Sequence, residues 1–246
     1  MPSGLDGNPD PIKTAARDSV LEQLARAVDA INQPRVVVGI DGGPGAGKST
    51  LADELAVRLR NRNRTVLRST TDLFHRPRAE RYHRGPSSPE GYYQDSHDLD
   101  GIEDKLLAPF RHGERKVQVS AFDEPSDTPK VDHASDLPPT PVLIFDGLFL
   151  QRPELADYFD LVIYLTAESR RATGWLGYLL TDLPDHVVQR VAELDRRLAR
   201  ARWPRYGAGW GLYLADVDPA AKAHFIVDND DLAAPVLLGA TVGGAT

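Results

Sequence analysis

Five short segments rich in β-branched and other apolar residues predict strands, and segments with helical spacing separate them. The strand segments are residues 36–40, 65–70, 142–147, 161–166 and 224–228. The first and third are almost wholly apolar, which is typical of strands buried on both faces of a parallel sheet. Apolar residues at helical spacing precede the first strand and follow it from Lys48. Strands that alternate with helices predict an α/β fold with a three-layer, doubly wound and mainly parallel sheet.

The segment 73–98 has a different pattern, because it is polar, contains Pro and Gly, and is crowded with Arg, His and Tyr. A loop of this length is usually functional or disordered, and its many aromatic residues favour a substrate loop. A short helix is predicted over 99–110 and an edge strand over 116–122, followed by a loop or small flap over 123–141.

The remaining segments set the domain boundaries. Residues 1–11 are rich in Gly, Pro, Asn and Asp, and residues 236–246 in Gly, Ala and Val, so both are predicted to be flexible tails. Residues 12–235 are predicted to form one domain. An apolar stripe after Pro184 predicts a further helix.

A glycine-rich motif directly follows the first predicted strand. Residues 42–50 read Gly-Gly-Pro-Gly-Ala-Gly-Lys-Ser-Thr and fill every fixed position of G-x-x-x-x-G-K-[ST]. Glycines let backbone N–H groups approach phosphate oxygens, and the N-terminus of the following helix adds unpaired donors and a positive dipole. Lys48 would reach the β- and γ-phosphates of a nucleotide, and the Ser49 hydroxyl would hold Mg²⁺. A glycine-rich turn that merely joins strand to helix is the alternative. The residues expected at the nucleotide are Gly43, Gly45, Ala46, Gly47, Lys48, Ser49 and Thr50.

Two aspartates follow predicted strands. Asp72 comes directly after the second strand. In an open parallel sheet the carboxyl ends of strands line the ligand crevice, so Asp72 is expected beside the glycine-rich loop. Asp146 ends the buried third strand, as expected of a Walker B strand that supports Mg²⁺. The alternative for Asp146 is a side chain that caps the turn before Gly147.

Composition narrows the function classes. The 246 residues are 41% hydrophobic and 26% charged, which is ordinary for a globular protein. The net charge of −7 argues against a nucleic-acid-binding surface. The chain has no cysteine, which excludes disulfides, thiolate zinc sites and thiol catalysis and is compatible with a reducing cytosol. With no long apolar run and no signal-like N-terminus, we expect a cytoplasmic protein without a membrane partner.

Several short pieces of the chain, in their order, resemble the uridine kinase-like branch of P-loop kinases. That branch also includes phosphoribulokinase and the bacterial pantothenate kinase type, and the chain is most similar to bacterial proteins labelled uridine kinase. The pieces are residues 39–42 with the glycine-rich motif, 51–56, 74–82, 88–93, 145–147, 212–215 and 227–229. Only the glycine-rich motif is specific by itself, so the resemblance depends on the order of the pieces.

The resemblance implies a kinase, a phosphotransferase that uses ATP and Mg²⁺ to phosphorylate a hydroxyl of a small-molecule acceptor, usually a nucleoside. Asp72 matches the family's catalytic aspartate, which orients the acceptor hydroxyl and takes its proton. The alternative for Asp72 is an unpaired surface aspartate. Lys48 would supply positive charge together with Mg²⁺, for which Ser49 and Asp146 are the expected residues. The family often self-associates, so a homo-oligomer is also implied.

The resemblance also places the remaining site residues. Arg170 and Arg171 would clamp ATP phosphates in a helical lid of about residues 168–212. Tyr93, Asp95 and His97 lie where the family contacts the sugar, and Phe122 lies where it lines the base. A plain solvated loop is the alternative for these four. The full set expected at the acceptor is Phe74, His75, Arg78, Tyr82, Tyr93, Asp95, His97, Phe122 and Trp175.

Two departures from the family pattern keep other functions open. Glu124, Pro125 and Ser126 stand where relatives continue with His and then Arg, and the lid is apolar over 174–180. An apolar lid suits a larger and less polar ligand, contacted by Trp175, unless these residues only pack the lid helix. The second hypothesis is therefore a diverged enzyme that activates a hydroxyl of an apolar metabolite for dehydration or cyclisation, with little kinase activity. A third is a nucleotide-dependent regulatory binder, although no Asn-Lys-x-Asp guanine-reading motif is present.

Overall fold

The central element of the molecule is a six-stranded sheet whose strand order is β2-β5-β1-β6-β7-β8. The computed structural model describes residues 13–167 and 205–240. Strands β2 (Val66–Thr70), β5 (Val142–Asp146), β1 (Val36–Gly42), β6 (Leu161–Thr166) and β7 (Phe225–Asp228) run parallel, as the sequence predicts. All residues of β1 and β5 are buried, because these central strands are covered on both faces.

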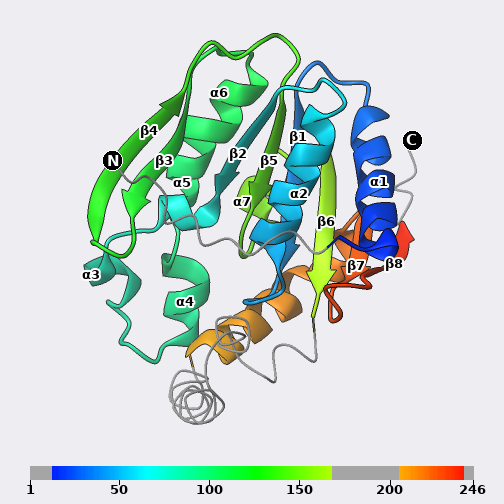
Figure 1. Ribbon diagram of the computed structural model, residues 1–246. Coiled ribbons are helices and arrows are strands. Elements are labelled where there is room, and N and C mark those ends of the chain that lie inside the picture. The colour runs from blue at the N-terminus through cyan, green and yellow to red at the C-terminus, as the bar shows by residue number, and fades with distance from the viewer. Residues whose placement is uncertain (1–12, 168–204, 241–246) are drawn as a thin grey trace, which may run out of the picture.

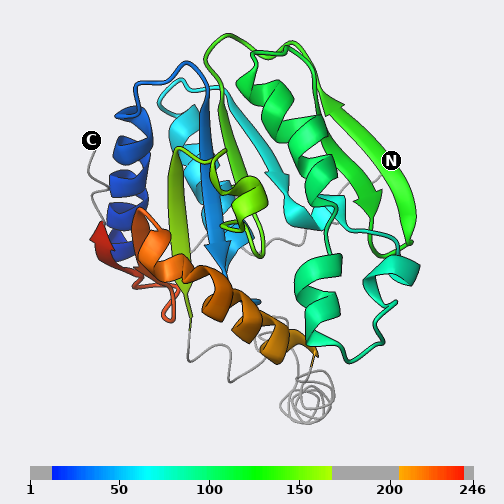
Figure 2. The ribbon, with the colours of Figure 1, turned by 180° about the vertical axis from the view of Figure 1, so that it is seen from behind.

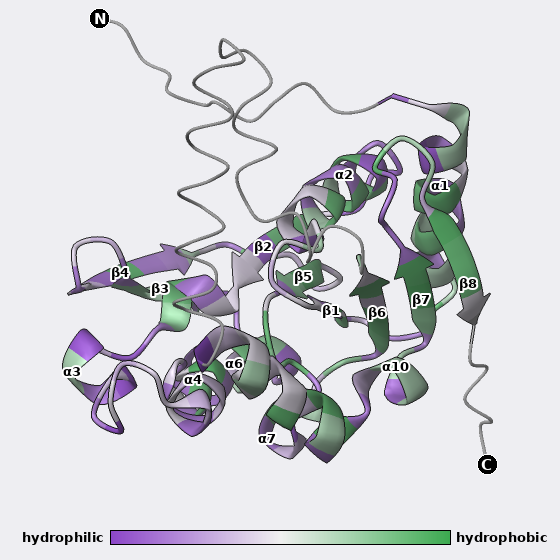
Figure 3. Cartoon of the chain, turned by 90° about the horizontal axis from the view of Figure 1, so that it is seen from below, coloured by the Kyte–Doolittle hydropathy of each residue, from purple (hydrophilic) through white to green (hydrophobic). Residues whose placement is uncertain are grey.

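Helices cover both faces of this sheet, which confirms the predicted three-layer α/β fold. On one face lie α1 (Ala15–Asp29) and α2 (Lys48–Arg60) (Figure 1). Their apolar stripes pack on β1, β5 and β6 in one core cluster, which includes Leu24 and Leu55. The opposite face is covered by a longer set of helical segments, seen from behind in Figure 2 and edge-on in Figure 3. These segments are α5 (Leu99–Ile102), η2 (Glu103–Leu107), α6 (Ala108–Arg111), α7 (Pro153–Ala156), α10 (Pro219–Lys222) and a helix over 205–217.

The segment 73–98, which the sequence analysis interprets as a loop, contains short helices. η1 (Thr71–Phe74) begins inside the turn after β2, and α3 (Arg78–Arg81) and α4 (Pro89–Asp95) follow. Local capping explains α4, because the Ser88 hydroxyl accepts a hydrogen bond from the N–H of Gly91 and a proline occupies the first turn. Such short helices have no apolar periodicity long enough to be recognised in a sequence.

A separate two-stranded sheet lies beside β2. β3 (Val117–Asp123) pairs antiparallel with β4 (Thr128–Ala134), so the segment predicted as an edge strand is one arm of a hairpin. Within the segment predicted as a loop or small flap, β4 forms the other arm. Almost every residue of β4 is exposed, which explains its polar, pattern-free sequence.

The C-terminal prediction is wrong for its first five residues. Val236–Ala240, assigned to a flexible tail, forms β8 and pairs antiparallel with β7. Without β8, the hydrogen-bonding groups of β7 would lie at the edge of the sheet. The predicted tail over 1–11, the helix after Pro184 and the lid up to residue 204 lie outside the described residues.

Candidate active site

The glycine-rich loop joins the carboxyl end of β1 to the first turn of α2 (Figure 1). Gly45 has φ 75° and Gly47 has φ 88°, in the left-handed region that favours glycine. Gly47 is the N-cap of α2 and has no side chain that could bond to the first N–H groups of this helix. In a helix these N–H groups point towards the N-terminus, which here is the loop. The predicted nucleotide residues Gly43, Gly45, Ala46, Gly47, Lys48, Ser49 and Thr50 all lie on this loop and turn.

Two side-chain contacts hold the loop. The Lys48 ammonium donates to the carbonyl oxygen of Gly43 at 3.0 Å, which places its charge over the loop. The Asn229 amide, buried after β7, donates to the carbonyl oxygen of Ala46 at 2.7 Å. Asn229 in turn accepts a hydrogen bond from Arg17 of α1. The loop that would receive phosphates is therefore tied to both ends of the described chain.

The predicted magnesium residues lie in contact. The Ser49 hydroxyl donates to Oδ2 of Asp146 at 2.7 Å, and Asp146 is only 1% exposed at the end of β5. Arg68 of β2 donates to the other oxygen, Oδ1, at 2.8 Å. The carboxylate thus contacts side chains from α2 and β2, which favours the Walker B interpretation over a cap of its own turn. A hydroxyl and a carboxylate are oxygen ligands, which fit Mg²⁺. Sequence reasoning missed Arg68, because an arginine within a strand belongs to no motif that would indicate a contact with Asp146.

A buried carboxyl group at the base of the loop was also missed. Asp41 has no exposed surface, and burial raises the pKa of its carboxyl group. It accepts hydrogen bonds from the hydroxyl of Tyr213, from the Gln151 amide at 3.0 Å and from the N–H of Gly42 at 2.8 Å. Burial and the neighbouring Asp41 raise the pKa of Tyr213, so its hydroxyl keeps the proton that it donates. This contact links helix 205–217 to the end of β1.

Asp72 lies where the sequence predicts it, directly beyond the carboxyl end of β2. Thr70 is in register with Asp146 on the neighbouring β5, and the Thr70 hydroxyl accepts a hydrogen bond from the N–H of Asp72. The Asp72 side chain is exposed and borders a cavity of about 480 Å³. Four further predicted acceptor residues line this cavity: His75, Tyr82, His97 and Phe122.

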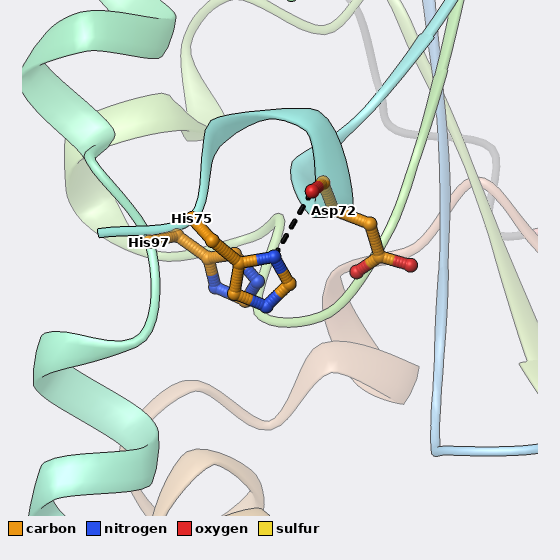
Figure 4. Close-up of side chains that lie close together, drawn as sticks. All are labelled: Asp72, His75 and His97. Atoms are coloured by element: carbon orange, nitrogen blue, oxygen red, sulfur yellow. Dashed lines mark hydrogen bonds between the residues drawn. The ribbon is translucent and has the colours of Figure 1, made fainter. Parts of the chain in front are cut away.

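Two histidines that line the cavity, His75 and His97, lie close together (Figure 4). The rings of His75 and His97 lie 4.7 Å apart between centroids, and their backbones form an isolated antiparallel bridge. The His75 ring nitrogen Nδ1 bonds to the backbone oxygen of Asp72 at 2.9 Å. His97 is 4% exposed, and burial, with the nearby positive groups, lowers the pKa of its imidazole well below the usual value.

Sequence reasoning missed three other residues that line the cavity. Tyr92 of α4 and Tyr206 of helix 205–217 meet edge to face at 4.7 Å between ring centroids. Arg205 lies over Tyr82 at 4.4 Å and donates to three backbone oxygens of the segment 81–88, so it joins helix 205–217 to that segment. These contacts connect residues more than a hundred positions apart and leave no local pattern.

Glu124, where the sequence departs from the family, lies in the same cavity. Its carboxylate accepts a hydrogen bond from the guanidinium of Arg81 at 2.7 Å, and Arg81 is itself 6% exposed. Asp127 lies 3.5 Å from the same guanidinium. Glu124 therefore places a carboxylate paired with Arg81, rather than an isolated charge, in the turn between β3 and β4.

The other predicted acceptor residues that the structure describes do not line this cavity. Phe74 is fully buried in the core, and the Tyr93 hydroxyl donates to Asp216 at 2.6 Å. Asp95 accepts a hydrogen bond from Arg84 at 2.8 Å, while the guanidinium of Arg78 lies over the ring of Tyr82. Arg170, Arg171 and Trp175 lie outside the described residues.

Within residues 13–167 and 205–240, no helix is long and apolar enough to cross a membrane.

Known proteins share part of this sequence and its fold. No protein-family model matches the chain. A Schizosaccharomyces pombe protein with a provisional uridine kinase name is 29% identical over 195 residues, which is 71% of this chain and 80% of that protein. A solved structure from Bacillus stearothermophilus, also provisionally described as a uridine kinase, is 25% identical with a TM-score of 0.65. That match covers 85% of this chain and 97% of the other.

A more distant structure shows the fold alone. D-glycerate 3-kinase from Cryptococcus neoformans is 15% identical, covers 92% of this chain and 99% of its own, and has a TM-score of 0.51. The described chain therefore has the fold of P-loop kinases and carries their glycine-rich loop. Within that class the chain is similar to uridine kinase-like proteins, which confirms the resemblance indicated by its motifs.

Proposed function

We propose that this protein transfers the γ-phosphoryl group of ATP to a hydroxyl of a small polar acceptor, most favourably a nucleoside. One observation supports this above the others. The exposed carboxylate of Asp72 lines the cavity and directly follows β2, the strand beside the one that Asp146 ends. Phosphoryl transfer depends on this kind of arrangement, because its main requirements are positioning and charge stabilisation.

Each part of the site has a role in the proposed reaction. The amides of the glycine-rich loop and the Lys48 ammonium would bind the phosphates of ATP. Ser49 and Asp146 would hold Mg²⁺, which neutralises developing negative charge when bound. Asp72 would orient the acceptor hydroxyl and accept its proton.

The shape and chemistry of the cavity support a nucleoside over an apolar metabolite. Its volume of about 480 Å³ lies in the usual range for a small-molecule site. Tyr82, Tyr92 and Phe122 offer ring faces and edges to a flat base. The same cavity is lined by the polar groups of His97 and Glu124, which would be costly to desolvate against an apolar ligand. The names of the Schizosaccharomyces pombe and Bacillus stearothermophilus relatives also favour a nucleoside.

The test is ADP release from ATP and Mg²⁺ with a panel of uridine, cytidine, purine nucleosides, glycerate and simple sugars. We expect release that depends on a nucleoside, and Asp72→Asn should reduce kcat by about 10² to 10⁴, the usual contribution of a general base. Asp104→Asn, the same change at an exposed aspartate of η2, is the matched control and should leave kcat unchanged.

Other outcomes would replace the proposal. Release that depends only on a non-nucleoside would retain the kinase and change the acceptor. ATP binding without release for any acceptor would favour the diverged enzyme or the regulatory binder. Equal rates in Asp72→Asn and Asp104→Asn would remove Asp72 from the catalytic role.

A further inference from the structure

The structure brings three metal-ligating side chains together in the acceptor cavity. One ligand atom each from Asp72, His75 and His97 lies within 4.8 Å of the other two. Figure 4 shows both imidazole rings side by side, with one carboxylate oxygen of Asp72 turned to their side. Among the residues that the structure describes, these three are the one such group of histidine and acidic side chains.

The hydrogen bond of His75 sets the direction of its free electron pair. The backbone oxygen of Asp72 can only accept, so the bonded Nδ1 of His75 carries a hydrogen in the neutral ring. The other nitrogen, Nε2, is then left with a lone pair. A ring N–H that donates to a backbone carbonyl is the usual way in which proteins orient a metal-binding histidine.

His97 supplies the second, independent observation. Its ring is 4% exposed, and Nε2 has no hydrogen-bond partner within the described chain. An unpaired polar atom in a protein interior costs free energy, so such an atom in a native fold points to a partner that is bound there. All three residues line the cavity, and their burial increases from exposed Asp72 through half-buried His75 to buried His97.

We propose that Asp72, His75 and His97 form a binding site for a divalent transition-metal ion of the Zn²⁺ class. Two imidazole nitrogens and one carboxylate oxygen are the donors that this class prefers, whereas Mg²⁺ prefers oxygen alone. Two atoms bound to one zinc ion at about 2.1 Å each lie at most about 4.2 Å apart, so modest side-chain rotation closes the site. Three protein ligands leave a fourth position open to the cavity. A bound ion would also occupy Asp72, so metal and acceptor hydroxyl would compete for it.

The test is a zinc titration of the full chain against a chromophoric chelator, without nucleotide or acceptor. The wild-type protein should bind one equivalent of Zn²⁺ that millimolar Mg²⁺ does not displace. His75→Gln and Asp72→Asn should each weaken binding at least about tenfold, the smallest effect usual even for residues that only support a ligand. His112→Gln is the matched control, because it removes an exposed histidine outside the cavity.

The result is independent of the proposed kinase activity, because no turnover is measured. His97→Gln should also weaken zinc binding, and since it alters a buried residue, far-UV circular dichroism must show that the variant is folded. The half-buried His75 keeps the test decisive if that variant does not fold. Absence of a zinc equivalent in the wild type, or equal affinity in His75→Gln and His112→Gln, would overturn the proposal.

Discussion

At the scale of single residues, the carboxyl group of Asp41 lies beneath the glycine-rich loop without any exposed surface. Three donors surround it, and one of them is the hydroxyl of Tyr213 on a helix more than 170 positions away. A buried carboxyl group is tolerated only where such donors satisfy its oxygens. The end of β1 therefore depends on side chains that the loop motif does not include.

Removal of the Tyr213 hydroxyl tests this dependence. Tyr213→Phe leaves Asp41 with one donor fewer and leaves the N–H of Gln151 without its acceptor. We expect the free energy of unfolding to fall by about 2 to 3 kcal/mol, since both remaining groups are buried. Tyr158→Phe, which breaks a half-buried bond to Glu103, should cost less than about 1 kcal/mol. Urea denaturation measures both, and equal losses would contradict the assigned role of Tyr213.

Two glycines should respond oppositely to the same substitution. A Cβ at Gly147 would lie 2.1 Å from the hydroxyl oxygen of Thr71, a buried side chain that accepts a hydrogen bond from the N–H of Leu148. Gly147→Ala should therefore destabilise the fold by about 2 kcal/mol. Gly211 lies in helix 205–217, and no heavy atom lies within 4 Å of the position that a Cβ would take there. Gly211→Ala should therefore stabilise the fold by up to about 1 kcal/mol. Thermal unfolding of the pair checks the opposite signs.

At the scale of elements, Arg17 holds α1 against the rest of the molecule. Its guanidinium is 1% exposed, pairs with Glu54 of α2, and donates to Asn229 and to the backbone oxygen of Leu232. Since Asn229 also bonds to the glycine-rich loop, one arginine connects α1, α2 and the segment after β7. The apolar stripe of α1 predicts that it packs on the sheet, but not this connection.

Arg17→Met should preserve much of the side chain's volume while removing its charge. Glu54 would remain nearly buried without its partner, so we expect a loss of about 3 kcal/mol or more in unfolding free energy. Arg26→Met removes an exposed i,i+4 pair with Glu22 on the same helix and should cost less than about 0.5 kcal/mol. Chemical denaturation of both variants gives the comparison. A loss in Arg17→Met no larger than in Arg26→Met would show that α1 is held by apolar packing alone.

The elements also show which features a sequence can reveal. Strands β1, β5 and β6 could be predicted because burial on both faces requires nearly continuous apolar runs. The partly exposed strands β2 and β7 could be predicted from their β-branched and aromatic residues. β8 could not, because Val236–Ala240 becomes a strand only through antiparallel pairing with β7. Likewise, β4 has polar and exposed residues whose extended shape depends on pairing with β3.

The candidate site also contains residues that the sequence could predict and residues that it could not. Asp146 ends β5, Asp72 follows β2, and Lys48 and Ser49 follow the loop after β1. Parallel strands bring their carboxyl ends together, so the proximity of these residues follows from the order of elements. Arg205 and Tyr206 reach the cavity only because helix 205–217 packs across α4, with contacts to Tyr82 and Tyr92. Motifs therefore predict the candidate phosphate site, whereas tertiary packing brings further residues such as Arg205 and Tyr206 into the candidate acceptor cavity.

At the scale of the whole molecule, the candidate phosphate site joins parts of the chain that are distant in sequence. Strands β2, β5 and β1 supply Asp72, Asp146 and the loop at one edge of the sheet, while Asn229 fixes the loop from the far side of β6. A ligand that binds this edge contacts groups from several elements at once. Ligand binding to the folded state alone stabilises it by mass action, so nucleotide binding should raise the stability of the entire fold.

We expect ATP with Mg²⁺, at one hundred times its dissociation constant, to increase the free energy of unfolding by about 2.7 kcal/mol. Lys48→Met removes the charge that the structure places over the loop and should abolish most of that gain at the same ATP concentration. Lys105→Met, at an exposed lysine of η2, is the matched control and should retain the gain. Urea unfolding with and without ATP measures all three proteins. Because the comparison uses each variant's own nucleotide-free stability, a general loss of stability in Lys48→Met does not affect the result. An equal gain in Lys48→Met and Lys105→Met would locate the nucleotide away from this loop and would remove the basis for the phosphate site.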